Sequence, residues 1–145
     1  MRDEWDVAEG TVEEPVRRVL LYSDHVHTRE SVLLGVGTRV AKDLPRVEWV
    51  EVATHAMVVS RVETEHFDLL ILDGEAGKSG GLGLCRQLKD EIFRCPPVLV
   101  LVGRREDLWL ASWSEADAVL ARPLDPLELQ ETVARMLRVP AGGAR

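Results

Sequence analysis

Two aspartates, Asp24 and Asp73, each stand at the end of a short apolar run, residues 19–22 and 69–72. In a parallel α/β sheet, functional groups collect at the carboxyl ends of the strands, beside the point where the strand order reverses. A pair of carboxylates at such an edge suits a hard cation with oxygen ligands, and a carboxylate can also act as a nucleophile. We therefore expect Asp24 and Asp73 to face one crevice.

The segments between these acids alternate between two hydrophobic periods. Short runs rich in Val, Leu and Ile predict strands at 19–22, 47–53, 69–72, 98–102 and 118–121, and longer 3.6-period segments predict helices at 28–44, 55–65, 82–92, 106–113 and 125–137. Gly35 and Gly37 weaken the first of these helices. Asp125 as N-cap, Pro126 at the first helical position and Glu128 at the third predict the start of the last one.

Five strand–helix units of this kind predict an α/β fold. Strands that are apolar throughout require cover on both faces, and right-handed crossovers then give a three-layer, doubly wound, five-stranded parallel sheet. In the flavodoxin-like strand order 2-1-3-4-5, the strands that end at Asp24 and Asp73 are neighbours.

Length, charge and composition exclude several classes of protein. The chain has 145 residues, enough for one domain, and a net charge of -7, which disfavours nucleic-acid binding. No apolar run reaches the ~20 residues that span a bilayer, so we expect no membrane insertion. Two cysteines, Cys85 and Cys95, suit a reduced, cytoplasmic chain better than a disulfide framework.

The two ends of the chain differ from its middle. We expect an acidic N-terminal tail over residues 1–16, a globular domain over 17–138 and a short tail over 139–145. Residues 1–15 carry six acidic residues, one arginine and one tryptophan, Trp5. Such a segment is either a solvated tail or one that a partner orders.

The chain resembles the receiver (CheY-like) domain of two-component response regulators over about residues 17–138. In that family a phospho-accepting aspartate follows the third strand, and a glycine and a leucine that lead into a helix follow eight and nine residues later. Asp73, Gly81 and Leu82 have that spacing here, and Arg122 and Pro123 enter the last helix as in the family. The resemblance implies that Asp73 is the candidate phospho-acceptor.

Several positions depart from the receiver pattern. Receivers have two acidic residues after the first strand, whereas this chain has Ser23 and Asp24. The family's Ser or Thr that binds the phosphoryl group after the fourth strand is replaced by Val102 and Gly103. The lysine after the fifth strand is Arg122, which keeps the charge but has a planar guanidinium. The residues that sense a phosphoryl group are therefore altered, although the acceptor is retained.

These departures leave two interpretations of Asp73. It is either a residue merely retained at a strand end or a live nucleophile toward a phosphohistidine or small phosphodonor. An acidic pocket of Asp24, Asp73 and Glu75, with the Glu75 carbonyl as a ligand, is expected to hold at most a weak Mg²⁺ ion. We expect no tightly bound cofactor.

Two tryptophans, Trp109 and Trp113, are four residues apart on the predicted helix 106–113. At least one is expected to help cover the sheet. This helix has more apolar surface than one core-facing stripe needs, and the resemblance places the partner-binding surface of receivers here. Because tryptophan is enriched at interface hot spots, Trp5, Trp109 and Trp113 are the candidate partner-binding residues.

Three functions remain open: an interaction module that needs no phosphorylation, a working regulator phosphorylated on Asp73 by a histidine kinase, and a small enzyme or ligand binder. The third has only the fold behind it, so we expect that the chain is not an enzyme. Short stretches at 19–24, 71–75, 87–91 and 109–114 resemble actinobacterial orphan response regulators associated with respiratory complex I, the NADH–quinone oxidoreductase. That resemblance implies an accessory subunit, peripheral at the inner face of the cell membrane.

Overall fold

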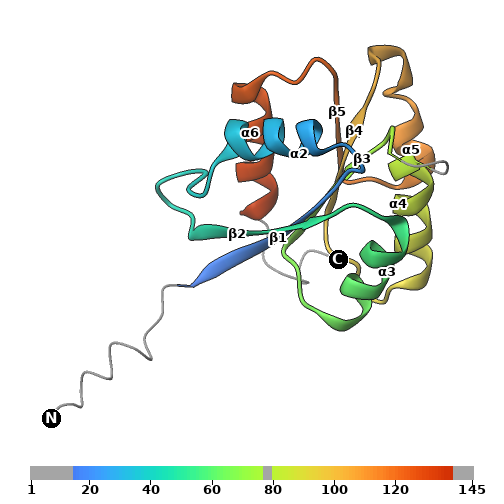
Figure 1. Cartoon of the computed structure of the whole chain (residues 1–145), viewed down its shortest axis with the longest axis horizontal. Coiled ribbons are helices and arrows are strands. Elements are labelled where there is room, and N and C mark those ends of the chain that lie inside the picture. The colour runs from blue at the N-terminus through green and yellow to red at the C-terminus, as the bar shows by residue number, and fades with distance from the viewer. Residues whose placement is uncertain (1–14, 77–79, 139–145) are drawn as a thin grey trace, which may run out of the picture.

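A computed structural model describes residues 15–76 and 80–138 and shows the expected parallel five-stranded sheet, in the order β2-β1-β3-β4-β5 (Figure 1). The predicted fold class is confirmed. The strands are β1 (Val16–Tyr22), β2 (Arg46–Val52), β3 (Leu69–Asp73), β4 (Val98–Val102) and β5 (Ala118–Ala121). The helices are α2 (Val26–Val36), α3 (His55–Thr64), α4 (Gly80–Glu91), the 3-10 turn η1 (Arg105–Asp107), α5 (Leu110–Ser114) and α6 (Pro126–Leu137).

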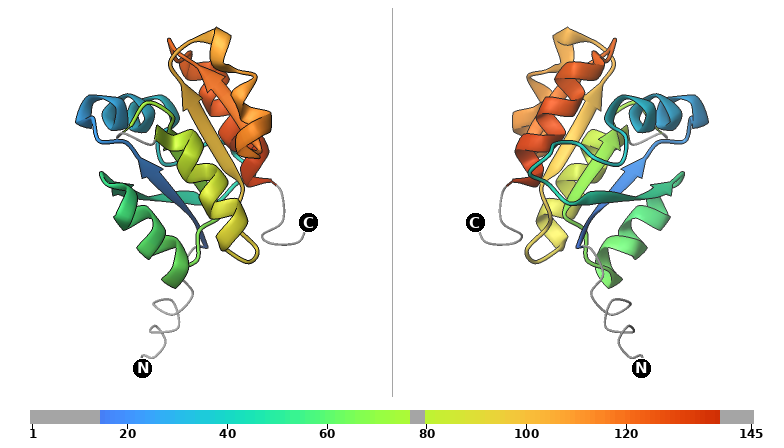
Figure 2. Two further views of the ribbon diagram at one scale, coloured as in Figure 1. Left: turned by 90° about the vertical axis from the view of Figure 1, so that its right-hand side faces the viewer. Right: turned by 90° about the vertical axis from the view of Figure 1, so that its left-hand side faces the viewer.

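Helices cover both faces of the sheet, because its strands are apolar on both sides. Alternate residues of β1, such as Val19 and Leu20, point to opposite faces and enter two separate cores. One core includes residues of α2 and α6, and the other includes residues of α3 and α4 (Figure 2). All five residues of β3 and all five of β4 are buried. Asp73, the last residue of β3, is therefore held in place by the buried centre of the sheet.

Helix α2 differs from the helix predicted at 28–44, since it begins at Val26 and ends at Val36. Gly37 has φ 76°, a left-handed conformation that stops the helix, and its amide donates to the Leu33 carbonyl at 2.8 Å. The Trp49 indole also donates to the Gly37 carbonyl, at 2.9 Å. Val40 remains in the core from an irregular segment, so its apolar periodicity indicated burial and not helix.

The helix predicted over 106–113 is also wrong in its extent. The chain forms η1 and then the separate five-residue α5, with Trp109 in the turn between them. Asp107 and Leu108 donate backbone hydrogen bonds to residues three earlier, a tighter pattern than that of an α-helix. Trp109 and Trp113 therefore do not share one helix.

The start of the last helix is as predicted: Asp125 is the N-cap of α6, and its carboxylate accepts a hydrogen bond from the Leu127 amide at 3.0 Å. The predicted tails lie outside the described residues, apart from Pro15 and from Val16, which is the first residue of β1. Among the described residues, no helix has the length and apolar character needed to cross a membrane.

An exposed ion pair joins the segment after α2 to the end of α6. Arg138 donates to both carboxylate oxygens of Asp43, at 2.8 and 2.9 Å, and this lowers the pKa of Asp43 to about 2. A carboxyl whose pKa is depressed on folding stabilises the folded state above its unfolded pKa of about 4 and loses that effect as the pH falls toward 2. We therefore expect Asp43→Asn to flatten the fall in melting temperature between pH 4 and pH 2. Equal slopes for the wild type and the variant would show that this pair makes no contribution.

Candidate functional site

Asp73 is the last residue of β3, and its side chain is 1% exposed. Its Oδ2 atom accepts a hydrogen bond from the Ser23 hydroxyl at 2.8 Å. Its Oδ1 atom accepts from the Arg122 guanidinium at 2.6 Å and from the Glu75 backbone amide at 2.9 Å. Donors from this same chain therefore engage both oxygens of the candidate phospho-acceptor.

Ser23 connects Asp73 to the loop between β1 and α2. Its hydroxyl is buried and accepts from the His25 amide at 3.0 Å while it donates to Asp73. Arg29 of α2 donates to the Ser23 carbonyl at 2.6 Å and to Glu51 of β2 at 3.0 Å. The residue that replaces a receiver's second acid thus has a defined structural role, because it uses its hydroxyl as donor and acceptor together.

Arg122, the residue after β5, is the positively charged partner of Asp73. Its amide donates to the Val102 carbonyl at 3.0 Å, which extends the pairing of β5 with β4 and aims the side chain at Asp73. The guanidinium side chain is 28% exposed, whereas the carboxylate that it pairs with is almost fully buried. Burying a lone carboxylate costs several kcal/mol. Arg122 therefore supplies the charge that makes a buried Asp73 tolerable.

Asp24 follows Ser23 in the loop after β1. Its carboxylate is 40% exposed and lies 3.7 Å from His25 Nε2. Burial raises the pKa of the Tyr22 hydroxyl, and the negative charges of Asp24 and then Asp73 raise it further. Both predicted acids thus lie at the same end of the sheet, around Tyr22.

Glu75 extends from the Asp73 loop toward the end of β4. Its Oε2 atom accepts a hydrogen bond from the Gly103 amide at 3.3 Å. The Val102 side chain, by contrast, is fully buried in the core. Of the three positions that correspond to phosphate-sensing residues, only Arg122 contacts Asp73, while Gly103 contacts Glu75.

The resemblance implies a Mg²⁺ ion bound beside the acceptor aspartate, and the arrangement of Asp24, Asp73 and Glu75 does not fit one. Within residues 15–76 and 80–138, no three His, Cys, Asp or Glu side chains gather to hold a metal. Asp73 Oδ2 accepts a hydrogen bond from Ser23, and Oδ1 accepts from Arg122 and from the Glu75 amide. An Mg²⁺ ion needs several oxygen ligands in near-octahedral geometry, and Ser23 has a hydroxyl where receivers have a second carboxylate.

Both described tryptophans of the predicted partner-binding set are exposed. The expectation that at least one covers the sheet is wrong, since Trp109 is 70% exposed and Trp113 is 50% exposed. Arg86 of α4 lies over the Trp113 ring, 5.1 Å from its centroid, and donates to the Trp113 carbonyl at 2.8 Å. Trp5 lies outside the described residues. The neighbouring Leu108 takes the place in the core that a tryptophan was expected to fill.

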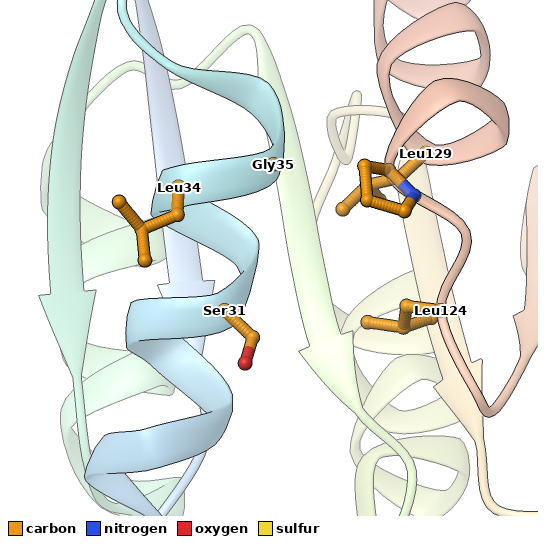
Figure 3. A pocket seen from close by; sticks show the side chains of 6 residues that line it. Ser31, Leu34, Gly35, Leu124 and Leu129 are labelled. Atoms are coloured by element: carbon orange, nitrogen blue, oxygen red, sulfur yellow. The ribbon is translucent and has the colours of Figure 1, made fainter.

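A shallow groove of about 370 Å³, which was not predicted from the sequence, lies between α2 and the start of α6 (Figure 3). Gly35 leaves space opposite Leu129, and the exposed Leu34 stands at the rim. In the sequence, the groove could have been recognised from Leu34 and Gly35, two adjacent residues that do not fit a core-facing stripe of α2. A second hollow, which shares Ser31 and Leu124 with the groove, reaches Arg122.

Neither Cys85 nor Cys95 forms a disulfide, and both side chains are buried. Burial raises the pKa of the Cys85 thiol to about 12, so it is not a nucleophile at neutral pH.

Comparison with known proteins agrees with this architecture. The chain is 52% identical over 124 residues to an uncharacterized response regulatory protein of Mycobacterium tuberculosis, covering 86% of this chain and 93% of that protein. It is 35% identical to the response regulator protein PmrA of Pseudomonas aeruginosa, covering 88% of this chain and 55% of PmrA. No family model matches the chain.

Solved receiver structures share the fold at low sequence identity. The chemotaxis response regulator CheY4 of Vibrio cholerae superposes with a TM-score of 0.71 at 18% identity, over 84% of this chain and 99% of that one. A CheY-like receiver domain protein of Methanospirillum hungatei gives 0.66 at 20% identity, over 85% and 94%. Together with the 52% identity to a response regulatory protein, these matches show that the chain belongs to the response regulator family, as a receiver domain.

Proposed function

We propose that this receiver is a protein-interaction subunit, not an enzyme, and that it works without phosphorylation of Asp73. One observation supports this proposal above all: the Ser23 hydroxyl and the Arg122 guanidinium engage the two oxygens of a carboxylate that is 1% exposed. A nucleophilic carboxylate needs a free oxygen and a cation that meets the incoming phosphoryl group. Here the available positive charge is already paired with the nucleophile.

The proposed partner is the NADH–quinone oxidoreductase, on its cytoplasmic side. The resemblance of residues 19–24, 71–75, 87–91 and 109–114 to orphan regulators associated with that complex supports this choice. Two exposed tryptophans, Trp109 in the turn before α5 and Trp113 on α5, supply the kind of apolar anchor that interface hot spots use. The acidic residues 1–15 would add charge complementarity to a basic partner surface.

Co-purification from native membranes tests the partner. Tagged full-length chain, incubated with gently solubilised membranes of its own organism, is expected to retain subunits of the oxidoreductase, identified by mass spectrometry. Recovery of a histidine kinase with no oxidoreductase subunit would instead favour the alternative, a working phosphorelay receiver.

Phosphorylation of Asp73 is expected to be poor. With acetyl phosphate and Mg²⁺, the wild type should be labelled slowly and incompletely, because no cation site is ready beside the buried carboxylate. The double variant Ser23→Asp/Arg122→Lys restores the receiver pattern at two positions, and we expect its labelling to rise at least about tenfold. Intact-mass spectrometry measures the labelled fraction.

Two results decide between the interpretations. Asp73→Asn in the double-variant background should abolish the restored label and so identify its position. Rapid stoichiometric labelling of the unaltered chain, lost in the single variant Asp73→Asn, would contradict the proposal.

A further inference from the structure

Glu75 is a charged residue for which the proposed function has not accounted. Its backbone amide is held by Asp73 Oδ1 at 2.9 Å, so the start of the side chain is fixed relative to the acceptor. Its carboxylate reaches across to the Gly103 amide, the first residue after β4. One residue therefore connects the loop after β3 with the loop after β4.

The absence of a side chain at position 103 permits this contact. A Cβ atom built on Gly103 would lie 3.0 Å from both Cδ and Oε2 of Glu75, closer than an ordinary van der Waals contact. The pKa of Arg104 is raised first by its hydrogen bond to Asp107, and the negative charges of Glu106 and then Glu75 raise it further. The Glu75 carboxylate thus lies against Gly103, at the start of the β4–η1 loop.

That loop leads directly to the exposed tryptophans. Arg104 pairs with Asp107 at 3.1 Å and caps η1, and the half-buried Leu108 then packs into the core. Trp109 follows immediately, and Trp113 lies on α5. Movement at Gly103 and Arg104 would therefore be transmitted to this surface over only a few residues.

We propose that Glu75 is a built-in anionic clasp that holds the β4–η1 loop, and with it the Trp109–Trp113 surface, in one arrangement without any added ligand. This inference rests on the proposed function, because it explains how a docking surface could stay formed while Asp73 is unmodified. Glu75 acts here as a positioning residue through Gly103. The hydrogen bond is exposed and charge-assisted, so its loss should release the loop and leave the fold intact.

The first measurement is made on the isolated full-length chain. Removing one hydrogen bond of about 1 kcal/mol in Glu75→Ala should speed amide hydrogen exchange at Gly103 about fivefold. The indole signals of Trp109 and Trp113 in a nitrogen–proton NMR spectrum should shift in the same variant. Glu63→Ala, which removes an exposed glutamate from α3, is the matched control and should change neither.

A double-mutant cycle with Gly103→Ala tests the contact itself. In an otherwise wild-type chain, the methyl group that Gly103→Ala introduces should displace the Glu75 carboxylate and reproduce the indole shifts of Glu75→Ala. In a Glu75→Ala background the same methyl has no carboxylate to displace, so its further effect on the indole signals should be small. Additive shifts in the two backgrounds would overturn the proposed contact.

The possible outcomes separate this inference from the proposed function. Unchanged Gly103 exchange in Glu75→Ala overturns the clasp, whatever the chain binds. Faster exchange with unmoved indole signals overturns the link to the tryptophan surface. If the wild type recovers no oxidoreductase subunits, the proposed function fails, while exchange and indole signals that respond as expected still support the clasp.

Discussion

Replacing Arg122 with methionine is expected to lower the free energy of unfolding by about 3 kcal/mol. The substitution removes the guanidinium at 2.6 Å from Asp73 Oδ1 but retains much of the side-chain volume. It leaves a carboxylate that is 1% exposed with hydrogen bonds but without its opposite charge. Urea unfolding followed by circular dichroism measures the change.

A second substitution separates the charge effect from general damage at the β5–α6 corner. Asp73→Asn removes the buried charge, so in an Asp73→Asn background Arg122→Met should cost less than half as much. Arg46→Met, at an exposed arginine of β2, is the surface control and should change stability by less than about 0.5 kcal/mol. Equal losses in the two backgrounds would contradict the view that Arg122 acts as the counter-charge of Asp73.

If the chain docks on the respiratory complex as proposed, truncating either exposed tryptophan is expected to weaken that binding. A tryptophan that becomes buried at an interface typically contributes at least about 2 kcal/mol, so Trp109→Ala or Trp113→Ala should reduce affinity roughly thirtyfold or more. Stability should change little, since these side chains are 70% and 50% exposed in the isolated chain. Co-purification at several salt concentrations, together with urea unfolding, measures both effects.

The same assay tests the acidic segment. A chain lacking residues 1–15 should lose Trp5 and a charge of -5, and its binding should depend less on salt than that of the full-length chain. Phe93→Ala provides a matched aromatic control, because Phe93 is 86% exposed in the turn after α4. If the tryptophan variants, the shortened chain and the wild type recover the complex equally, neither surface is the docking site.

Much of the fold could be predicted from local pattern alone. The apolar run at 98–102 coincides with β4, and the run at 118–121 coincides with β5, because unbroken apolarity between turns leaves few other ways to bury both faces. Asp125 and Pro126 marked the start of α6 through capping chemistry, which acts within a few residues. The predicted strand order was that of flavodoxin-like sheets, and the structure confirms it.

Errors arose where apolar spacing indicated burial without indicating helix. Val40 and Leu44 are buried from an irregular segment, and the helix that was expected to include them ends at Val36 before the left-handed Gly37. At 106–113, burial of Leu108 and a 3-10 turn divided one predicted helix. Hydrophobic periodicity indicates which side chains are buried, while backbone hydrogen bonds determine whether the segment that carries them is a helix, a turn or irregular.

The sequence by itself determined that an aspartate ends β3, that a serine follows β1 and that an arginine follows β5. Only the tertiary structure decided that Ser23 and Arg122, 50 and 49 residues from Asp73, each engage one of its oxygens. It also decided that Glu75 turns to Gly103 and that both described tryptophans face solvent. The reason is physical: the pattern of polar and apolar residues sets which strand ends meet, but hydrogen bonds of about 3 Å depend on side-chain positions that only the packed sheet defines.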